Sequence, residues 1–144
     1  MSATADHAEE RTNPAARLGF EPGQVVQEIG YDDDVEQELR EGIEAVTGQE
    51  LQDEDYDDVA DVVLLWFRDE DGDLTDALVD AIGLIDEGGQ IWLLTPKTGR
   101  DGYIEPSDIN EAAQTAGLSQ TRSINAGKDW TGSRLVTPKS SGKR

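Results

Sequence analysis

The sequence predicts a three-layer α/β sandwich, in which helices cover both faces of a mostly parallel sheet and an antiparallel hairpin closes the chain. Two observations predict this fold class. Apolar runs typical of strands alternate with segments of helical periodicity, and two further strands follow the third helix. The run "VADVVLLWF" (Val59–Phe67) is apolar without polar alternation, which is typical of a parallel strand covered on both faces.

The first half of the chain is predicted to form two strands with a helix between them. Gln24–Ile29 is the first strand, and Val59–Phe67 is the second. Between them, Asp32–Asp34 are predicted to cap and begin a helix that runs to Val46, because negative charge complements the helix dipole there. Gly48 is predicted to end the helix. The stretch "ELQ" (50–52) could add a short edge strand.

The second half is predicted to contain two helices, a buried strand and a hairpin. The glycine pair at 88–89 is expected to separate the first of these helices from the strand. The hairpin is expected at the sheet edge, with a turn made by "AGKDWTG". In order, the predicted elements are helix Asp73–Ile85, strand Gln90–Pro96, helix Pro106–Ala116, and strands Leu118–Asn125 and Ser133–Pro138.

The chain of 144 residues supports one domain. We expect a disordered tail at 1–16, a single domain at 17–138 and a basic tail at 139–144. The first residues lack the apolar core of a signal peptide, and no apolar run approaches the ~18 residues that span a bilayer. We therefore expect a cytoplasmic protein. The chain has no cysteine, which excludes disulfides and thiolate sites.

The net charge of −20 is concentrated in one part of the chain. Residues 28–87 contain 23 acids and only two bases, Arg40 and Arg68, whereas residues 88–144 have a net charge of +3. Such a surface repels nucleic-acid phosphates and anionic membranes and attracts basic protein surfaces. We expect a protein partner with a basic surface, and neither direct nucleic-acid binding nor membrane binding. Solubility or adaptation to high salt is the alternative explanation of the charge.

Five segments carry a resemblance to a known family. They are "PGQVVQEIGYDDDVE", "DEDYDDVADVVLLWFRD", "DGDLTDALVDA", "GGQIWLLTPK" and "INAGKDWTGSRLV". Together they make the chain from about Leu18 to Lys139 similar to an actinobacterial family, domain of unknown function 3052. The core order also resembles the second half of a class I methyltransferase sheet in degenerate form. The resemblance implies a Rossmann-like fold and no particular activity.

The loop after the first strand does not match a cofactor loop. A methyltransferase has Gly-x-Gly there, and a dinucleotide fold needs G-x-G-x-x-G. This chain has a single glycine, Gly30, followed by Tyr31 and the three acids Asp32–Asp34, which would repel a phosphate. The only histidine is His7, so imidazole catalysis and histidine metal sites are not expected. We therefore predict no catalytic residues, no cofactor and no metal.

The carboxyl edge of the sheet, where open α/β folds bind their ligands, combines basic and aromatic residues. We call this set the predicted lip: Arg68, Thr95, Lys97, Arg100, Asn125, Lys128, Asp129, Trp130 and Arg134. It is either a binding site for an anion or for an acidic or aromatic partner segment, or a structural edge where bases pair with carboxylates and Trp130 covers the core. A second candidate surface is the acidic helix face with Glu36, Glu38, Glu41 and Glu44.

These features favour a non-catalytic regulatory or accessory protein that acts through protein–protein contacts. No nucleophile–base pair is evident, because Thr95, Ser107 or Ser133 would have to act without histidine. The alternative is a small-ligand or nucleotide-binding protein, vestigially methyltransferase-like, that uses the carboxyl edge of the sheet.

Overall fold

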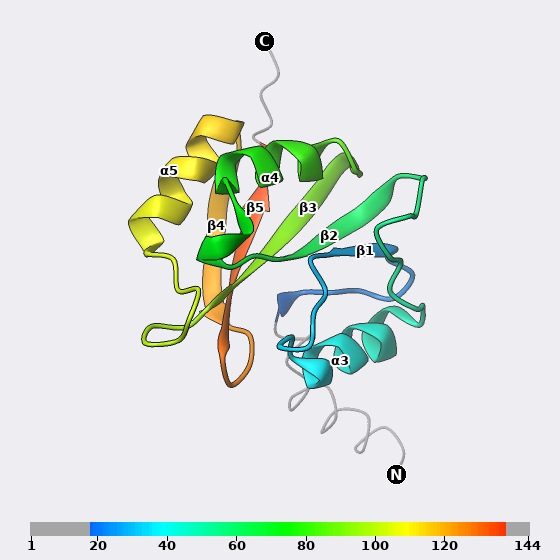
Figure 1. Ribbon diagram of the computed structural model, residues 1–144. Helices are drawn as coiled ribbons and strands as arrows, with labels where there is room; N and C mark the ends of the chain where they lie inside the picture. Colours follow the sequence, from blue (N-terminus) through cyan, green and yellow to red (C-terminus); the bar gives the residue numbers. More distant parts are fainter. Residues whose placement is uncertain (1–17, 138–144) are drawn as a thin grey trace.

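The computed structural model describes residues 18–137, which form one sheet with helices on both faces (Figure 1). The predicted tails at 1–16 and 139–144 lie outside the described residues. In chain order the elements are β1 (Val26–Ile29), α3 (Gln37–Thr47), β2 (Ala60–Trp66), the 3₁₀ helix η1 (Asp69–Asp71), α4 (Leu74–Ile82), β3 (Ile85–Pro96), α5 (Pro106–Ala116), β4 (Ser119–Asn125) and β5 (Trp130–Val136).

The sheet has the order β1-β2-β3-β5-β4. The pairs β1–β2 and β2–β3 are parallel, whereas β5 runs antiparallel to both β3 and β4. Only β5 therefore opposes the other four strands, and the prediction of a mostly parallel sheet with a C-terminal antiparallel hairpin is confirmed. The second strand of the hairpin is inserted between β3 and β4, so β4 alone forms that edge of the sheet.

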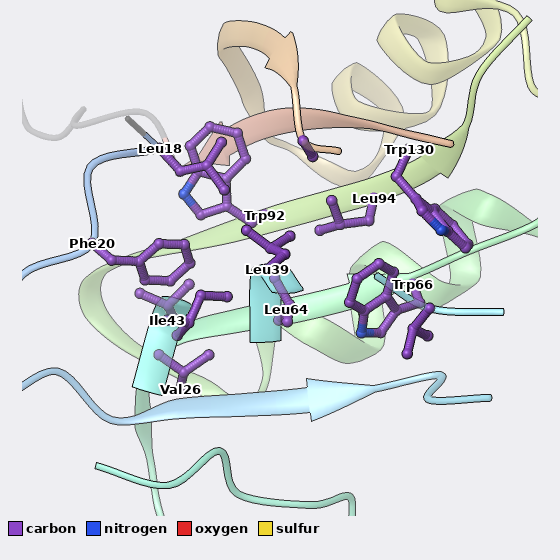
Figure 2. Packing of buried hydrophobic residues seen from close by; sticks show 13 residues of the cluster. Leu18, Phe20, Val26, Leu39, Ile43, Leu64, Trp66, Trp92, Leu94 and Trp130 are labelled. Atoms are coloured by element: carbon purple, nitrogen blue, oxygen red, sulfur yellow. The ribbon is translucent and has the colours of Figure 1, made fainter. Parts of the chain in front are cut away.

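Helix α3 covers one face of the sheet, and α4 and α5 cover the other (Figure 1). Successive side chains of a strand point to opposite faces, so the continuous apolar run of β2 supplies both cores. Val62, Leu64 and Trp66 pack with α3, whereas Val63 and Leu65 pack with α4 and α5. Figure 2 shows the core on the α3 side, where Trp66 and Trp130 lie beside each other at one end.

The helix after β1 begins later than predicted. Helix α3 begins at Gln37, and its N-cap Glu36 makes no side-chain capping bond. Asp32 instead accepts a hydrogen bond from the backbone N–H of Asp33 in a turn. The prediction that Asp32–Asp34 cap the helix is therefore wrong, because the chain first turns away from the end of β1. Gly48 ends the helix in the left-handed conformation, with a φ of 76°, as predicted.

Strand boundaries also differ from the prediction in the second half of the chain. Strand β3 begins at Ile85, and Gly88 and Gly89 lie inside it, where the register with β2 shifts. Glycine is required at position 89 of the strand because a side chain there would come within 2.9 Å of the carbonyl oxygen of Asp61. Strand β5 begins at Trp130 rather than Ser133, so the hairpin turn is shorter than expected.

Candidate functional site

The carboxyl ends of β1, β2 and β3 meet at one edge of the sheet, as parallel strands require. Two hollows flank the end of β3 at this edge and share Pro96. Thr95 and Lys97 line the hollow on the α5 side, of about 390 Å³. Trp130 lines the other, of about 470 Å³, together with Asp34, Arg100 and Asp129. The predicted lip is thus divided between the two faces.

Trp130 belongs to the core rather than to an exposed surface. Only 2% of the residue is exposed, and its ring meets that of Trp66 edge-on, with the ring centres 4.9 Å apart. Its indole N–H donates a hydrogen bond to the carbonyl oxygen of Asp34 at 3.0 Å. The interpretation of Trp130 as an exposed aromatic of a binding lip is therefore wrong, and the alternative of a lid on the core describes its position.

Arg68 connects four segments at the same edge. It is 7% exposed, and its guanidinium lies over the Trp130 ring, 5.2 Å from the ring centre. It donates to both carboxylate oxygens of Asp34, to the carbonyl of Gly30 at 2.8 Å and to the carboxylate of Asp71 at 3.3 Å. Hydrogen bonds from Arg68 lower the pKa of Asp34. The guanidinium charge is thus already neutralised within the protein.

The loop after β1 is closed by the chain itself. The N–H of Gly30 donates to the carboxylate of Glu54 at 2.9 Å, and its carbonyl accepts from Arg68. Gly30 has a φ of +84°, and a side chain there would come within 2.3 Å of the carbonyl oxygen of Trp66. Glycine therefore serves close packing of two strand ends, and both backbone groups that a cofactor could contact are used internally.

The remaining predicted lip residues are dispersed. Arg100 forms an ion pair with Asp129 at 2.9 Å, whereas Lys97 and Lys128 form none with any residue in 18–137. Asn125 is exposed at the end of β4, opposite Thr131. Arg134 does not belong to the lip, because β5 runs antiparallel and carries it toward the other end of the sheet. There it pairs with Trp92 in register and donates hydrogen bonds to Gln90 and Thr121.

The sequence did not predict a buried charge cluster beneath α3. Glu28 of β1 is 5% exposed and accepts two hydrogen bonds from Arg40, at 2.7 and 2.9 Å. It accepts a third from the indole N–H of Trp66 at 2.9 Å. Hydrogen bonding to Glu28 raises the pKa of Arg40. The available signal was a single acid within the predicted first strand, together with Arg40 as one of only two bases in residues 28–87.

The acidic surface of α3 is narrower than predicted. Glu36 accepts a hydrogen bond from the backbone N–H of Lys128, and Glu44 accepts one from that of Leu51. Glu38 and Glu41 are exposed and remain available. The surface continues into the segment that runs along the outer edge of β1. A parallel bridge between Gln27 and Gln52 holds this segment there, together with hydrogen bonds from the Gln27 side chain to the carbonyl oxygens of Asp53 and Tyr56 and from the Gly30 N–H to Glu54. Its exposed acids are Asp53, Glu54, Asp55, Asp57 and Asp58.

The described part of the chain has no group of three or more acidic or histidine side chains placed to hold a metal ion. Within residues 18–137, no helix is both long and apolar enough to cross a membrane.

The strand order and the helices on both faces make this an open α/β protein. Solved structures of methyltransferases have a similar fold. An O-methyltransferase of neocarzinostatin biosynthesis, NcsB1, aligns with a TM-score of 0.67 and 12% identity, covering 95% of this chain and 57% of that one. The CcbJ methyltransferase of Streptomyces caelestis aligns at 0.55 and 12% identity, covering 90% and 95% of the two chains. At these identities the similarity shows the fold alone.

The chain belongs to the family described as "Protein of unknown function (DUF3052)", whose model matches residues 15–139. It is 55% identical over 141 residues to the uncharacterized protein Rv2239c of Mycobacterium tuberculosis strain H37Rv, covering 97% of this chain and 87% of the relative. The uncharacterized protein Mb2263c of Mycobacterium bovis matches to the same extent. The family membership expected from the sequence segments is confirmed.

Proposed function

We propose that this protein is a non-catalytic regulatory or accessory protein that binds a partner with a basic surface. One observation carries the proposal: the chain's own groups occupy the cofactor end of the methyltransferase-like sheet. Glu54 and Arg68 bind the backbone of Gly30, while Trp66 and Trp130 pack edge-on against each other beneath the Arg68 guanidinium. Because both backbone groups of Gly30 are engaged, these contacts support a function other than methyl transfer.

The partner surface that we propose is the acidic flank, defined as exposed acids of α3 and of the segment beside β1. Its members are Glu38, Glu41, Asp53, Glu54, Asp55, Asp57 and Asp58. The two bases of residues 28–87 cannot neutralise this flank, because Arg40 binds Glu28 and Arg68 binds Asp34 and Asp71. Complementary charge of this kind speeds association with a basic partner and selects against acidic ones.

The test is affinity purification from the host lysate, with a flank variant and a variant of equal charge change. In the flank variant Glu38 and Glu41 become Gln, and Asp55 and Asp57 become Asn. All four are exposed and make no side-chain hydrogen bond or ion pair within residues 18–137, so folding should be unaffected. The control variant replaces four exposed acids on the opposite side of the sheet with their amides: Asp80, Glu105, Asp108 and Glu111.

We expect the flank variant to lose proteins that the wild type and the control variant both retain. Equal recovery by all three proteins would contradict the acidic flank as the partner surface. A thermal shift with S-adenosylmethionine at millimolar concentration tests the non-catalytic part separately. Saturable stabilisation there would show that the Gly30 loop opens for a cofactor.

A second candidate function is the binding of a small ligand at the carboxyl edge. The hollow on the α5 side of β3 favours it, because this pocket, unlike the Gly30 loop, is not filled by the chain.

A further inference from the structure

Four hydroxyl side chains from three adjacent strands share the sheet face on the α5 side. Thr95 of β3 pairs with Thr131 of β5, and Ser133 of β5 pairs with Ser123 of β4. All four line the pocket of about 390 Å³. Farther along the same face, the corresponding positions Leu93, Ile91 and Leu135 are apolar core residues. A polar floor thus replaces the core at the point where helix α5 no longer covers the sheet.

Two of these hydroxyls belong to residues that are almost fully buried. Thr95 is 2% exposed and Ser133 is 1% exposed. Neither side chain makes a hydrogen bond with another residue of the described range 18–137. Within residues 18–137 the side-chain atoms that are buried without a partner are Gln27 Oε1 and Trp92 Nε1, so the two hydroxyl oxygens are not sealed in the core but open into the pocket, where water or a ligand can bind them. Their position on the floor of a pocket indicates that they face what the pocket holds.

The charge of the pocket is opposite to that of the protein. Its twelve lining residues include one cation, Lys97, and no acid, although the chain contains 32 acids. Lys97 forms no ion pair within the described residues, so its ammonium group is available. The wall opposite the hydroxyl floor is apolar, with Ile104 and Ile109 among its members.

We propose that this pocket binds a small organic anion. A carboxylate or phosphate group would accept hydrogen bonds from the Thr95 and Ser133 hydroxyls and pair with Lys97, and an apolar body would lie against Ile104 and Ile109. Pockets of this volume suit small molecules, and a few polar groups in an apolar wall fix their orientation. The site lies across the sheet from the Gly30 loop, and it does not depend on the acidic flank.

The test is a nuclear magnetic resonance titration of the ¹⁵N-labelled protein with phenyl phosphate, benzoate and inorganic phosphate. We expect phenyl phosphate or benzoate to shift the amide signals of Thr95, Lys97 and Ser133 saturably. The compound that binds with the higher affinity shows whether the natural anion is a phosphate or a carboxylate. Inorganic phosphate should bind more weakly than phenyl phosphate, because it cannot use the apolar wall. Equal binding of both phosphates, or no shift at these amides, would overturn the proposal.

Two lysine variants separate this site from general attraction of anions. Lys97→Gln should weaken binding at least about tenfold, the size of one lost charge-assisted hydrogen bond. Lys128→Gln removes a second unpaired lysine that does not line this pocket and should bind as the wild type does. Equal weakening in both variants would overturn the proposal.

Thr95→Val tests the role of the hydroxyl independently of Lys97. Within residues 18–137 no group hydrogen-bonds this hydroxyl, so its replacement by a methyl group should leave the melting temperature nearly unchanged, while the anion binds at least about tenfold more weakly. A clear fall in melting temperature would show that the hydroxyl stabilises the fold and would remove the basis of the site.

Discussion

At the residue scale, Trp130 decides how the carboxyl edge is interpreted. Trp130→Ala should reduce the free energy of unfolding by about 3–5 kcal/mol, because a buried ring and its contact with Trp66 are lost. Chemical denaturation measures this. Trp130→Phe keeps a ring against Trp66 and should cost less. A loss below ~1 kcal/mol for the alanine variant would mean that the indole is not packed as described.

The buried carboxylate of Glu28 gives a second prediction at this scale. Glu28→Ala leaves the guanidinium of Arg40 and the indole N–H of Trp66 without their shared acceptor. Breaking a buried ion pair from one side typically costs about 3–5 kcal/mol, and we expect a destabilisation of that size in chemical denaturation. Glu41→Ala, on the exposed face of α3, should change stability by no more than about 0.5 kcal/mol. Similar losses in both variants would contradict a special role for Glu28.

The Arg68–Asp34 pair makes stability depend on pH at the acid end. The pKa of Asp34 in the folded protein lies below its ordinary value of 3.8, since Arg68 donates hydrogen bonds to the carboxylate. A lowered pKa means that the unfolded chain takes up the proton first. The stabilisation is therefore complete above about pH 4 and is lost as the pH falls through the folded pKa.

Comparison with Asp34→Asn isolates this contribution. Urea denaturation between pH 7 and pH 2 should show the wild type more stable than the variant at neutral pH, with the difference shrinking below about pH 4. A difference that stays constant down to pH 2 would contradict the ion pair as its source. Because much of the Asp34 side chain is exposed, salt should also reduce the difference.

At the element scale, β2 is the strand that both cores share. Leu64 is fully buried and lies between Glu28 of β1 and Trp92 of β3 in the register. Leu64→Ala should reduce the free energy of unfolding by about 2–5 kcal/mol, because transfer energy is lost and a cavity remains. The matched Val59→Ala change, at an exposed position just before β2, should have little effect. A cost below ~1 kcal/mol at Leu64 would contradict its central position.

Elements were predictable where local pattern and tertiary context agree. The apolar run of β2 and the glycine after α3 locate their elements correctly, because burial on both faces and a left-handed helix end each leave a direct sequence signal. The start of α3 was missed, since Asp32–Asp34 satisfy capping preferences equally well in a turn. The length of β3 was missed because two glycines, usually breakers, permit a register shift inside the strand.

The site was less predictable than the fold because it depends on which face each side chain occupies. Thr95 and Trp130 are near one another along the edge, but strand alternation sends them to opposite sides of the sheet. Insertion of β5 beside β3 moves Arg134 away from the edge, and no local signal specifies that pairing. The grouping of the Thr95 and Ser133 hydroxyls on the lining of one pocket becomes visible only once the neighbouring strands are placed.

At the scale of the whole molecule, uneven charge should make stability depend on salt. The net charge is −20, and Arg40 and Arg68, the two bases of residues 28–87, are both engaged in ion pairs. Repulsion between the remaining carboxylates opposes the compact state. Raising sodium chloride from about 0.01 M to about 1 M shortens the screening length from about 30 Å to about 3 Å, and the melting temperature should rise.

The flank variant shows where that repulsion originates. With Glu38 and Glu41 as Gln and with Asp55 and Asp57 as Asn, four charges leave one surface and the melting temperature at low salt should rise above that of the wild type. Its further rise with salt should be smaller, because less repulsion remains to be screened. The control variant removes the same charge from Asp80 on α4 and from Glu105, Asp108 and Glu111 on α5 and its N-cap. Three of these acids lie in residues 88–144, whose net charge is +3, so there is less repulsion to relieve and the effect should be weaker. If both variants shift the salt dependence equally, net charge rather than the flank governs stability, and the acids at the β1 edge have no special energetic role.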